Sequence, residues 1–258
     1  MHRKLFFFDA DGTLVPNDAQ HGPSPAVCAA LAALRRAGHR TFLCTGRTLC
    51  DIGPALLSAG FDGVVAGAGA YIRLDGECIY HHVIPTTLLR ATVDAILRCR
   101  ISCLLEGTYH FYYAGQGSRR LPWDFPRIAC AADVTGNESV EKFTAHVSGP
   151  GEFEPLRAFL APRYEIYGTD SGMFFEMALK GQDKASAIRR LCARCGIPPE
   201  DTVAFGDSRN DLAMLRAAGM GVAMGNAPAD VRAAARIVTG TVEEQGVPAA
   251  LRQLALIE

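Results

Sequence analysis

Short apolar runs alternate with helical patterns in the first third and the last third of the chain. Residues 5–8 are all apolar, and 41–44 and 202–205 repeat this pattern after a leading threonine. Runs of this length without an interior polar position are typical of strands buried on both faces. Between the first two runs, apolar residues recur at helical spacing within 24–38. Strands that alternate with helices predict a parallel sheet with right-handed crossovers, so the expected fold class is α/β.

The pattern changes after about residue 71. Residues 71–74 and 77–80 flank Asp75-Gly76, a dipeptide that favours a tight turn between two strands. More strand-like and helical stretches follow in a different order: strands at 101–105, 109–113, 142–147, 164–167 and 173–176, and helices near 86–99 and 153–160. This mixture predicts an inserted α+β domain rather than a continuation of the parallel sheet.

The alternation of strands and helices resumes at Gly181. We therefore expect residues 1–82 and 181–258 to form a Rossmann-like catalytic core. Residues 83–180 are expected to form an α+β cap that selects the substrate. Within the core, the pattern also predicts one continuous helix at 49–58 after the second strand.

The composition indicates which classes of binding partner and which cellular compartment to expect. The 258 residues include 26 basic and 27 acidic side chains, so no basic excess favours nucleic acid or anionic lipid. No apolar run approaches the ~20 residues that a membrane span needs. The odd count of nine cysteines shows no disulfide spacing, and no signal peptide is evident, so we expect reduced thiols in the cytoplasm. The chain is expected to be a monomer or a homodimer.

Two carboxylates follow the first strand directly. Asp9 and Asp11 are two positions apart, so in extended backbone both point to the same side. Gly12 then lets the chain turn away, because it accepts backbone angles that other residues avoid. Two carboxylates held close together shift each other's pKa unless a cation lies between them, and Mg2+ prefers such hard oxygen ligands. The alternative is a strand that ends in a polar Asx turn.

Three further polar segments are expected beside this pair. Thr45-Gly46-Arg47 follows the second buried strand, Lys184 stands where a helix begins, and Asp207 and Asp211 follow the strand at 202–205. Ligands bind at the carboxyl ends of the strands in sheets of this kind, so the four segments should meet at one edge. Asp207 and Asp211 would add oxygen ligands for the metal.

The residue types at this edge suit phosphoryl transfer. A carboxylate such as Asp9 can attack phosphorus and form an aspartyl-phosphate. A second carboxyl group, Asp11, can protonate the leaving oxygen and later deprotonate the attacking water. The hydroxyl of Thr45, the amide of Gly46 and the ammonium of Lys184 can stabilise the charge on the phosphate oxygens.

These motifs resemble those of the haloacid dehalogenase superfamily. Its four motifs are matched in order by Asp9-x-Asp11-Gly-Thr13, by Thr45, by a lysine at a helix start, and by Gly206-Asp207-Ser208-x-Asn210-Asp211. Thr45-Gly46-Arg47 and an α/β insert between the second and third motifs are similar to the Cof-type branch. Most members of that branch are phosphatases that act on small phosphorylated metabolites.

The resemblance implies a role for each matching residue. Asp9 would be the nucleophile and Asp11 the general acid and base. Mg2+ would be held by Asp9, the backbone carbonyl of Asp11 and Asp207, with Asp211 in support. The phosphate would be held by Thr45, Gly46 and Lys184, and Asn210 would orient Lys184 or the phosphate.

Three points stay open in the sequence. Lys180 is the alternative to Lys184 as the lysine of the third motif. Arg47 either touches the substrate or forms a surface ion pair. The branch usually has Asn-Gly-Ala after its third strand, whereas this chain has Ala68-Gly69-Ala70, which removes one polar contact.

The predicted function is therefore a Mg2+-dependent phosphatase of a small, sugar-phosphate-like metabolite. A phosphomutase of the same superfamily is one alternative, although about thirty residues separate Asp11 from the second strand, room for only one ordinary crossover. A second alternative is a phospho-accepting signalling switch, which would keep a long-lived phosphorylated state. Within the expected cap, the loop at 115–125 with Arg119, Arg120 and Trp123 is the candidate for substrate contacts.

Overall fold

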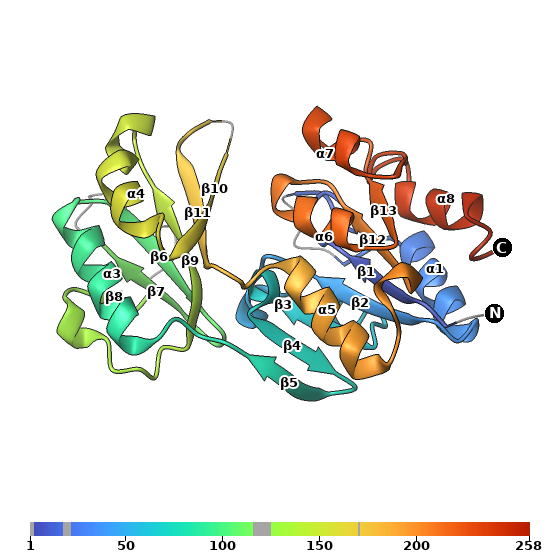
Figure 1. Ribbon diagram of the computed structural model, residues 1–258, viewed down its shortest axis with the longest axis horizontal. Coiled ribbons are helices and arrows are strands. Elements are labelled where there is room, and N and C mark those ends of the chain that lie inside the picture. The colour runs from blue at the N-terminus through green and yellow to red at the C-terminus, as the bar shows by residue number, and fades with distance from the viewer. Residues whose placement is uncertain (1–2, 18–21, 116–124, 170) are drawn as a thin grey trace. The chain divides into compact units, whose positions relative to one another are not determined.

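A computed structural model describes residues 3–17, 22–115, 125–169 and 171–258. The chain divides into two compact units (Figure 1). The first, called the core here, consists of Met1–Arg47, Asp51–His81 and Gln182–Glu258, and the second, called the insert, consists of Thr48–Cys50 and His82–Gly181. Each unit has its own sheet, and the α/β class predicted from the sequence is confirmed.

Within the described residues, the core sheet has eight strands in the order β14-β13-β12-β1-β2-β3-β4-β5. The pairs from β14 to β3 are all parallel, and β4 and β5 add an antiparallel hairpin at one edge. The strands are β1 (Leu5–Phe8), β2 (Arg40–Cys44), β3 (Gly63–Ala66), β4 (Tyr71–Leu74), β5 (Glu77–His81), β12 (Thr202–Gly206), β13 (Met220–Ala223) and β14 (Ile237–Val238).

Strand β1 lies between β12 and β2 and forms the centre of the core. All four of its side chains are fully buried. Phe7 stacks on Phe42 of β2 with ring centroids 5.1 Å apart, and Phe8 stacks on Phe205 of β12 at 5.0 Å. Burial of each large apolar side chain stabilises the fold by about 1.5–3 kcal/mol, so the aromatic run fixes the strand that ends at the carboxylates.

The helices of the core are α1 (Pro25–Arg36), α2 (Pro54–Leu57), α5 (Lys184–Cys195), α6 (Leu212–Ala217), α7 (Ala229–Ala234) and α8 (Gly246–Gln253). Asp183 caps α5 by accepting a hydrogen bond from the Ser186 amide, and Gly196 ends this helix at φ +65°. The position of Lys184 at the first turn is therefore set by local capping chemistry.

The continuous helix predicted at 49–58 is wrong. A 3₁₀ turn covers Leu49–Asp51, and α2 begins afresh at Pro54. Gly53 has extended angles, because proline disfavours the helical conformation in the residue before it. The short strands β8 (Arg127–Ile128) and β14 were not predicted, since two residues are too few to display an alternating pattern.

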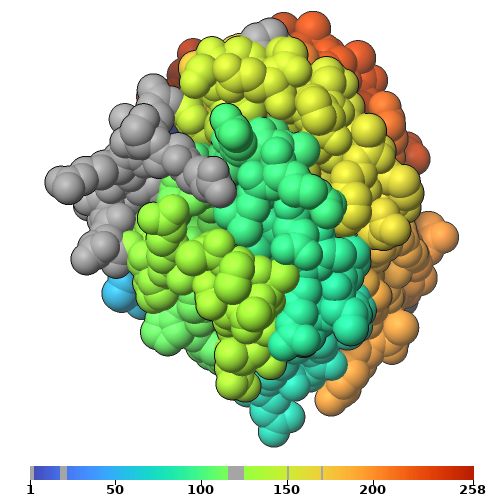
Figure 2. Space-filling model, turned by 90° about the vertical axis from the view of Figure 1, so that its left-hand side faces the viewer, coloured from blue at the N-terminus to red at the C-terminus, as the bar shows by residue number. Residues whose placement is uncertain are grey.

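The insert has a mixed sheet whose described strands run in the order β10-β11-β9-β6-β7-β8. Apart from β8, these are β6 (Ser102–Gly107), β7 (Phe111–Ala114), β9 (Val140–His146), β10 (Tyr164–Gly168) and β11 (Phe174–Leu179). Helices α3 (Thr86–Arg98) and α4 (Glu154–Leu160) pack against the apolar side chains of this sheet, and Figure 2 shows the helix-covered face. On the other face of the sheet, Lys142 forms ion pairs with Glu106 and Glu176.

The three residues Thr48–Cys50 belong to the insert although they lie far from it in sequence. The Cys50 amide donates to the Thr108 carbonyl at 3.0 Å, and its thiol donates to the Gly107 carbonyl at 3.4 Å. In the part of the chain that the structure describes, no helix combines the length and the apolarity that crossing a bilayer would require.

Candidate active site

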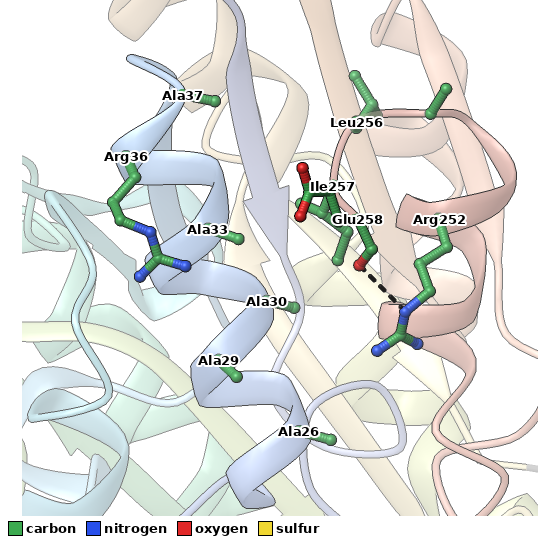
Figure 3. A pocket seen from close by; sticks show the side chains of 11 residues that line it. Ala26, Ala29, Ala30, Ala33, Arg36, Ala37, Arg252, Leu256, Ile257 and Glu258 are labelled. Carbon is green, nitrogen blue, oxygen red and sulfur yellow. Dashed lines mark hydrogen bonds between the residues drawn. The ribbon is translucent and has the colours of Figure 1, made fainter.

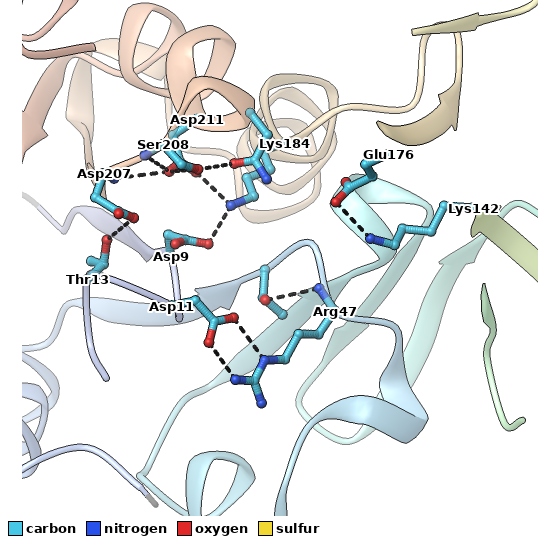
Figure 4. A network of polar contacts seen from close by, with 12 residues as sticks. Asp9, Asp11, Thr13, Arg47, Lys142, Glu176, Lys184, Asp207, Ser208 and Asp211 are labelled. Atoms are coloured by element: carbon cyan, nitrogen blue, oxygen red, sulfur yellow. Dashed lines mark hydrogen bonds and ion pairs between the residues drawn. The ribbon is translucent and has the colours of Figure 1, made fainter. Parts of the chain in front are cut away.

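The predicted motif residues of the core meet where β1, β2 and β12 end and where α5 begins (Figure 4). Asp9 follows β1 directly, and its amide donates to the Phe205 carbonyl of β12 at 2.9 Å. Thr45 follows β2 and is held by the Val65 carbonyl of β3 at 2.9 Å. The site is therefore built on strand ends that the buried sheet fixes in place.

Lys184 connects two of the carboxylates. Its Nζ lies 2.5 Å from Asp9 Oδ1 and 2.6 Å from Asp211 Oδ1, and its side chain is 1% exposed. Lys180 is exposed. The structure thus brings Lys184, rather than Lys180, to the expected nucleophile.

The electrostatics of this group follow from burial. Desolvation, with the Asp211 charge added, raises the pKa of Asp9 well above its usual range even though Lys184 opposes the shift. Desolvation and Asp211 likewise raise the pKa of Asp207 to about 6. Burial by itself would lower the pKa of Lys184, but the carboxylates of Asp211 and Asp9 raise it well above its usual value. Lys184 therefore stays charged, and more positive charge at the site would favour ionised carboxylates.

The carboxylates suit a hard divalent cation. Asp9, Asp207 and Asp211 each offer an oxygen, and these oxygens lie within 4.8 Å of one another. Asp211 already accepts hydrogen bonds from Lys184 and, through Oδ2, from the amides of Asp207 at 3.1 Å and Ser208 at 3.0 Å. Its bonds fix the turn that carries Asp207. A buried group of carboxylate oxygens matches the ligand preference of Mg2+.

Two further residues hold Asp207. Thr13 Oγ1 donates to Asp207 Oδ1 at 3.3 Å, and Asn226 Nδ2 donates to Asp207 Oδ2 at 3.2 Å and to the Gly12 carbonyl at 2.9 Å. Gly12 has φ +75°, and a Cβ atom there would lie 2.1 Å from Asp207 Oδ2, so only glycine fits. Asn226 was missed in the sequence. The available signal was a polar residue just beyond a buried strand at this same edge.

Arg47 contacts Asp11. Its Nε donates to Asp11 Oδ2 at 2.9 Å and its Nη2 donates to Oδ1 at 2.5 Å. This hydrogen bonding raises the pKa of Arg47. The ion pair that the sequence left open thus involves the predicted general acid and base. Gly46, whose amide was expected to hold phosphate, is half-buried between Thr45 and Arg47.

Two other predicted features have defined contacts, and the role expected for Asn210 toward Lys184 or the phosphate stays a prediction. Asn210 accepts a hydrogen bond from the Ser208 hydroxyl at 2.7 Å. The turn at Ala68-Gly69 packs on the start of α5, because a Cβ atom at Gly69 would lie 2.3 Å from the Asp183 carbonyl oxygen. Ala68 itself has φ +54°, which is uncommon for a residue with a side chain.

A separate groove of about 640 Å³ in the core lies between α1 and the C-terminal segment (Figure 3). Alanines of α1 line one side, and the other side includes Arg252 and Glu258. None of the motif residues lines this groove. Arg119, Arg120 and Trp123, the candidates for substrate contacts, lie outside the described residues.

Comparisons with known proteins agree with this geometry. Residues 6–251 match the family of haloacid dehalogenase-like hydrolases. Phosphatase YwpJ of Bacillus subtilis is 29% identical, with 97% of this chain and 99% of that protein covered. A phosphoglycolate phosphatase of Methanopyrus kandleri is 30% identical, with 97% and 96% covered. The solved structure of the HAD subclass IIB sugar phosphatase BT4131 superposes with a TM-score of 0.84 at 29% identity, with 98% and 100% covered.

Proposed function

The chain belongs to the haloacid dehalogenase-like hydrolase family and is a phosphatase, and on this basis we propose that it hydrolyses small, sugar-phosphate-like metabolites with Mg2+ through an aspartyl-phosphate. The observation that carries the proposal is the placement of Asp9. It is 5% exposed at the end of the central strand, it contacts Lys184, and it shares one carboxylate cluster with Asp207.

The first half of the reaction transfers the phosphoryl group to the enzyme. A carboxylate oxygen of Asp9 forms a bond to phosphorus while the bond from phosphorus to the leaving oxygen breaks. Asp11 gives its proton to that leaving oxygen, so the product departs as an alcohol. Lys184 and the Thr45 hydroxyl stabilise negative charge on the transferring group.

The second half regenerates the enzyme. Asp11, now a carboxylate, takes a proton from water, and the water oxygen attacks phosphorus as the bond to Asp9 breaks. Asp9, the Asp11 carbonyl and Asp207 would hold Mg2+, and Asp211 would keep Asp207 in position. When bound, Mg2+ supplies positive charge beside the phosphate oxygens.

The insert is proposed to select the substrate as a cap, since contacts to phosphate alone are the same for every phosphate monoester. The face of its sheet opposite the helices carries donors and acceptors that pair with one another, of which Lys142 and Glu106 are buried and Glu176 is partly exposed. Lys142 Nζ lies 3.2 Å from Glu106 and 3.0 Å from Glu176, and the Thr144 hydroxyl donates to Glu106. Paired groups of this kind suit the hydroxyls of a sugar. The relatives include a sugar phosphatase and a phosphoglycolate phosphatase, so both substrate classes belong in the first screen.

The test is a screen of phosphorylated sugars, sugar acids and phosphoglycolate, with release of inorganic phosphate as the readout. We expect turnover with Mg2+ and none in excess EDTA. Undiminished activity in EDTA would contradict the metal requirement. Transfer of the phosphate to a second sugar would indicate a phosphomutase, and a long-lived phosphorylated protein would indicate a switch. The described residues between β1 and β2 contain only α1, which supports a phosphatase over a mutase with a cap at that position.

A further inference from the structure

Arg47 occupies both carboxylate oxygens of Asp11 through a forked pair of hydrogen bonds (Figure 4). The side chains are 22% and 32% exposed. A third contact, from Nη1 to the Asp51 carbonyl at 3.4 Å, holds the far side of the guanidinium. Forked arginine–carboxylate pairs are among the stronger polar interactions in proteins, and they fix orientation as well as charge.

This pair conflicts with the role proposed for Asp11. A guanidinium only donates hydrogen bonds, so the fork requires an acceptor at both oxygens of the carboxylate. The fork places an N–H group of Arg47 against each oxygen of Asp11, so neither oxygen is free to face the leaving oxygen of a substrate. Asp11 must therefore give up at least one of its two hydrogen bonds from Arg47 during each turnover.

The backbone of Arg47 cannot easily supply that movement. Its amide donates to Thr45 Oγ1 at 3.1 Å, and its carbonyl accepts from the Gly67 amide at 2.8 Å. Release therefore occurs by rotation of the side chain. Thr45 is also the residue proposed to hold the phosphate. Since Arg47 follows Thr45 by two positions, a phosphate dianion held by Thr45 would lie close to Arg47. Phosphate offers the same planar pair of acceptor oxygens as a carboxylate.

We propose that Arg47 is a substrate-released latch on Asp11. Before substrate binds, the fork holds the acid and base in one orientation. Phosphate then takes over the guanidinium, which frees Asp11 to take up a proton from solvent and pass it to the leaving oxygen. After hydrolysis Asp11 returns the proton that it took from water to the solvent, and departure of phosphate restores the fork. Arg47 is thus a positioning residue for Asp11, and Asp11 and phosphate compete for its guanidinium. The inference rests on the proposed function, since it assigns the acid and base role to Asp11.

Binding of inorganic phosphate in the presence of Mg2+ tests the competition without any turnover. Dissociation constants would be measured by calorimetry for wild type, Asp11→Asn, Arg47→Ala and the double variant. Loss of a negative charge by Asp11→Asn should tighten binding in either background. If the latch exists, Asp11→Asn also frees Arg47, so the gain should be about tenfold larger when Arg47 is present. Equal gains in the two backgrounds would overturn the latch.

A matched control removes a different arginine–carboxylate pair of the core. Asp75 Oδ2 accepts from Arg40 Nη1 at 2.9 Å, and Asp75→Asn should leave phosphate affinity unchanged. An equal gain in that variant would show a general charge effect and would also overturn the latch.

Steady-state kinetics give a second readout. Arg47→Lys keeps the positive charge for phosphate but cannot form the fork, so we expect kcat to fall about tenfold while KM changes less than about threefold. Arg47→Ala should raise KM as well. Wild-type values of both parameters in Arg47→Lys would contradict the positioning role. A wild-type protein that releases phosphate while the binding cycle shows no coupling would overturn the latch alone. Absence of both phosphate release and phosphate binding would overturn the proposed function with it.

Discussion

Replacement of Lys184 by methionine tests how the buried charges are balanced. The substitution keeps a long side chain but removes the ammonium between Asp9 and Asp211, which are 5% and 0% exposed. Removal of one partner from a buried ion pair leaves an uncompensated charge, and this lowers the free energy of unfolding by about 3–5 kcal/mol. At about 2–4 °C for each kcal/mol in a protein of this size, the melting temperature of the core should fall by about 6–20 °C.

The same reasoning predicts how Mg2+ changes the outcome. Without the ammonium, two carboxylates repel each other with less compensation, so a divalent cation should bind more tightly than in wild type. Added Mg2+ should therefore raise the melting temperature of Lys184→Met by more than that of wild type. Turnover should be lost in the variant even when Mg2+ restores stability, because no ammonium remains beside the transferring phosphate.

Thermal denaturation followed by circular dichroism, in EDTA and in Mg2+, measures both effects. Lys180→Met is the matched control, because Lys180 is exposed and such substitutions usually change stability by less than about 0.5 kcal/mol. Equal melting temperatures for the two variants in EDTA would refute the reasoning. A smaller Mg2+ response in Lys184→Met than in wild type would refute the predicted compensation.

Two further predictions concern pH and backbone strain. The pKa of Asp207 in the folded protein is about 6, above its ordinary value of 3.8, so protonation of this carboxyl stabilises the metal-free core at low pH. Up to about 3 kcal/mol of the free energy of unfolding is lost as pH rises through 6. Urea titrations should show a steeper loss of stability with rising pH in wild type than in Asp207→Asn, where the raised pKa of Asp9 still contributes. Mg2+ affinity should weaken below pH about 6, because protons then compete for the ligand, and identical slopes in the two proteins would contradict the shift. Ala68→Gly should change stability by less than about 0.5 kcal/mol, because relief of about 1–2 kcal/mol of left-handed strain offsets the lost methyl burial and the added chain entropy. Ala70→Gly, at φ −73° and 1% exposed, has no strain to relieve and should lose about 1–2 kcal/mol, so equal losses at the two sites would contradict the argument.

The centre of the fold was predictable because its signals are local. The run at 5–8 has no polar position, which identifies a fully buried strand, and Asp9 and Asp11 then follow at a spacing that places both on one side. Capping by Asp183 likewise favours Lys184 at the start of a helix. Each of these features depends on a few neighbouring residues, and the structure retains them.

Other features depend on contacts between distant segments. The fork between Arg47 and Asp11 depends on side-chain rotamers across 36 positions of sequence, and no periodicity encodes it. Asn226 reaches Asp207 only because β13 pairs with β12 in a particular register. Thr48–Cys50 belong to the insert, where the Cys50 amide donates to the Thr108 carbonyl, and backbone groups are alike in every sequence.

The central claim is that Asp9 accepts the phosphoryl group, and a rapid acid quench tests it most directly. Enzyme would be mixed with a ³²P-labelled phosphate monoester and Mg2+, quenched within one turnover and separated from free phosphate. Wild type should carry a transient burst of label on the protein. Asp9→Asn, folded by circular dichroism, should carry none and release no phosphate, because an amide is too weak a nucleophile. Labelled protein or normal phosphate release with Asp9→Asn would contradict the mechanism.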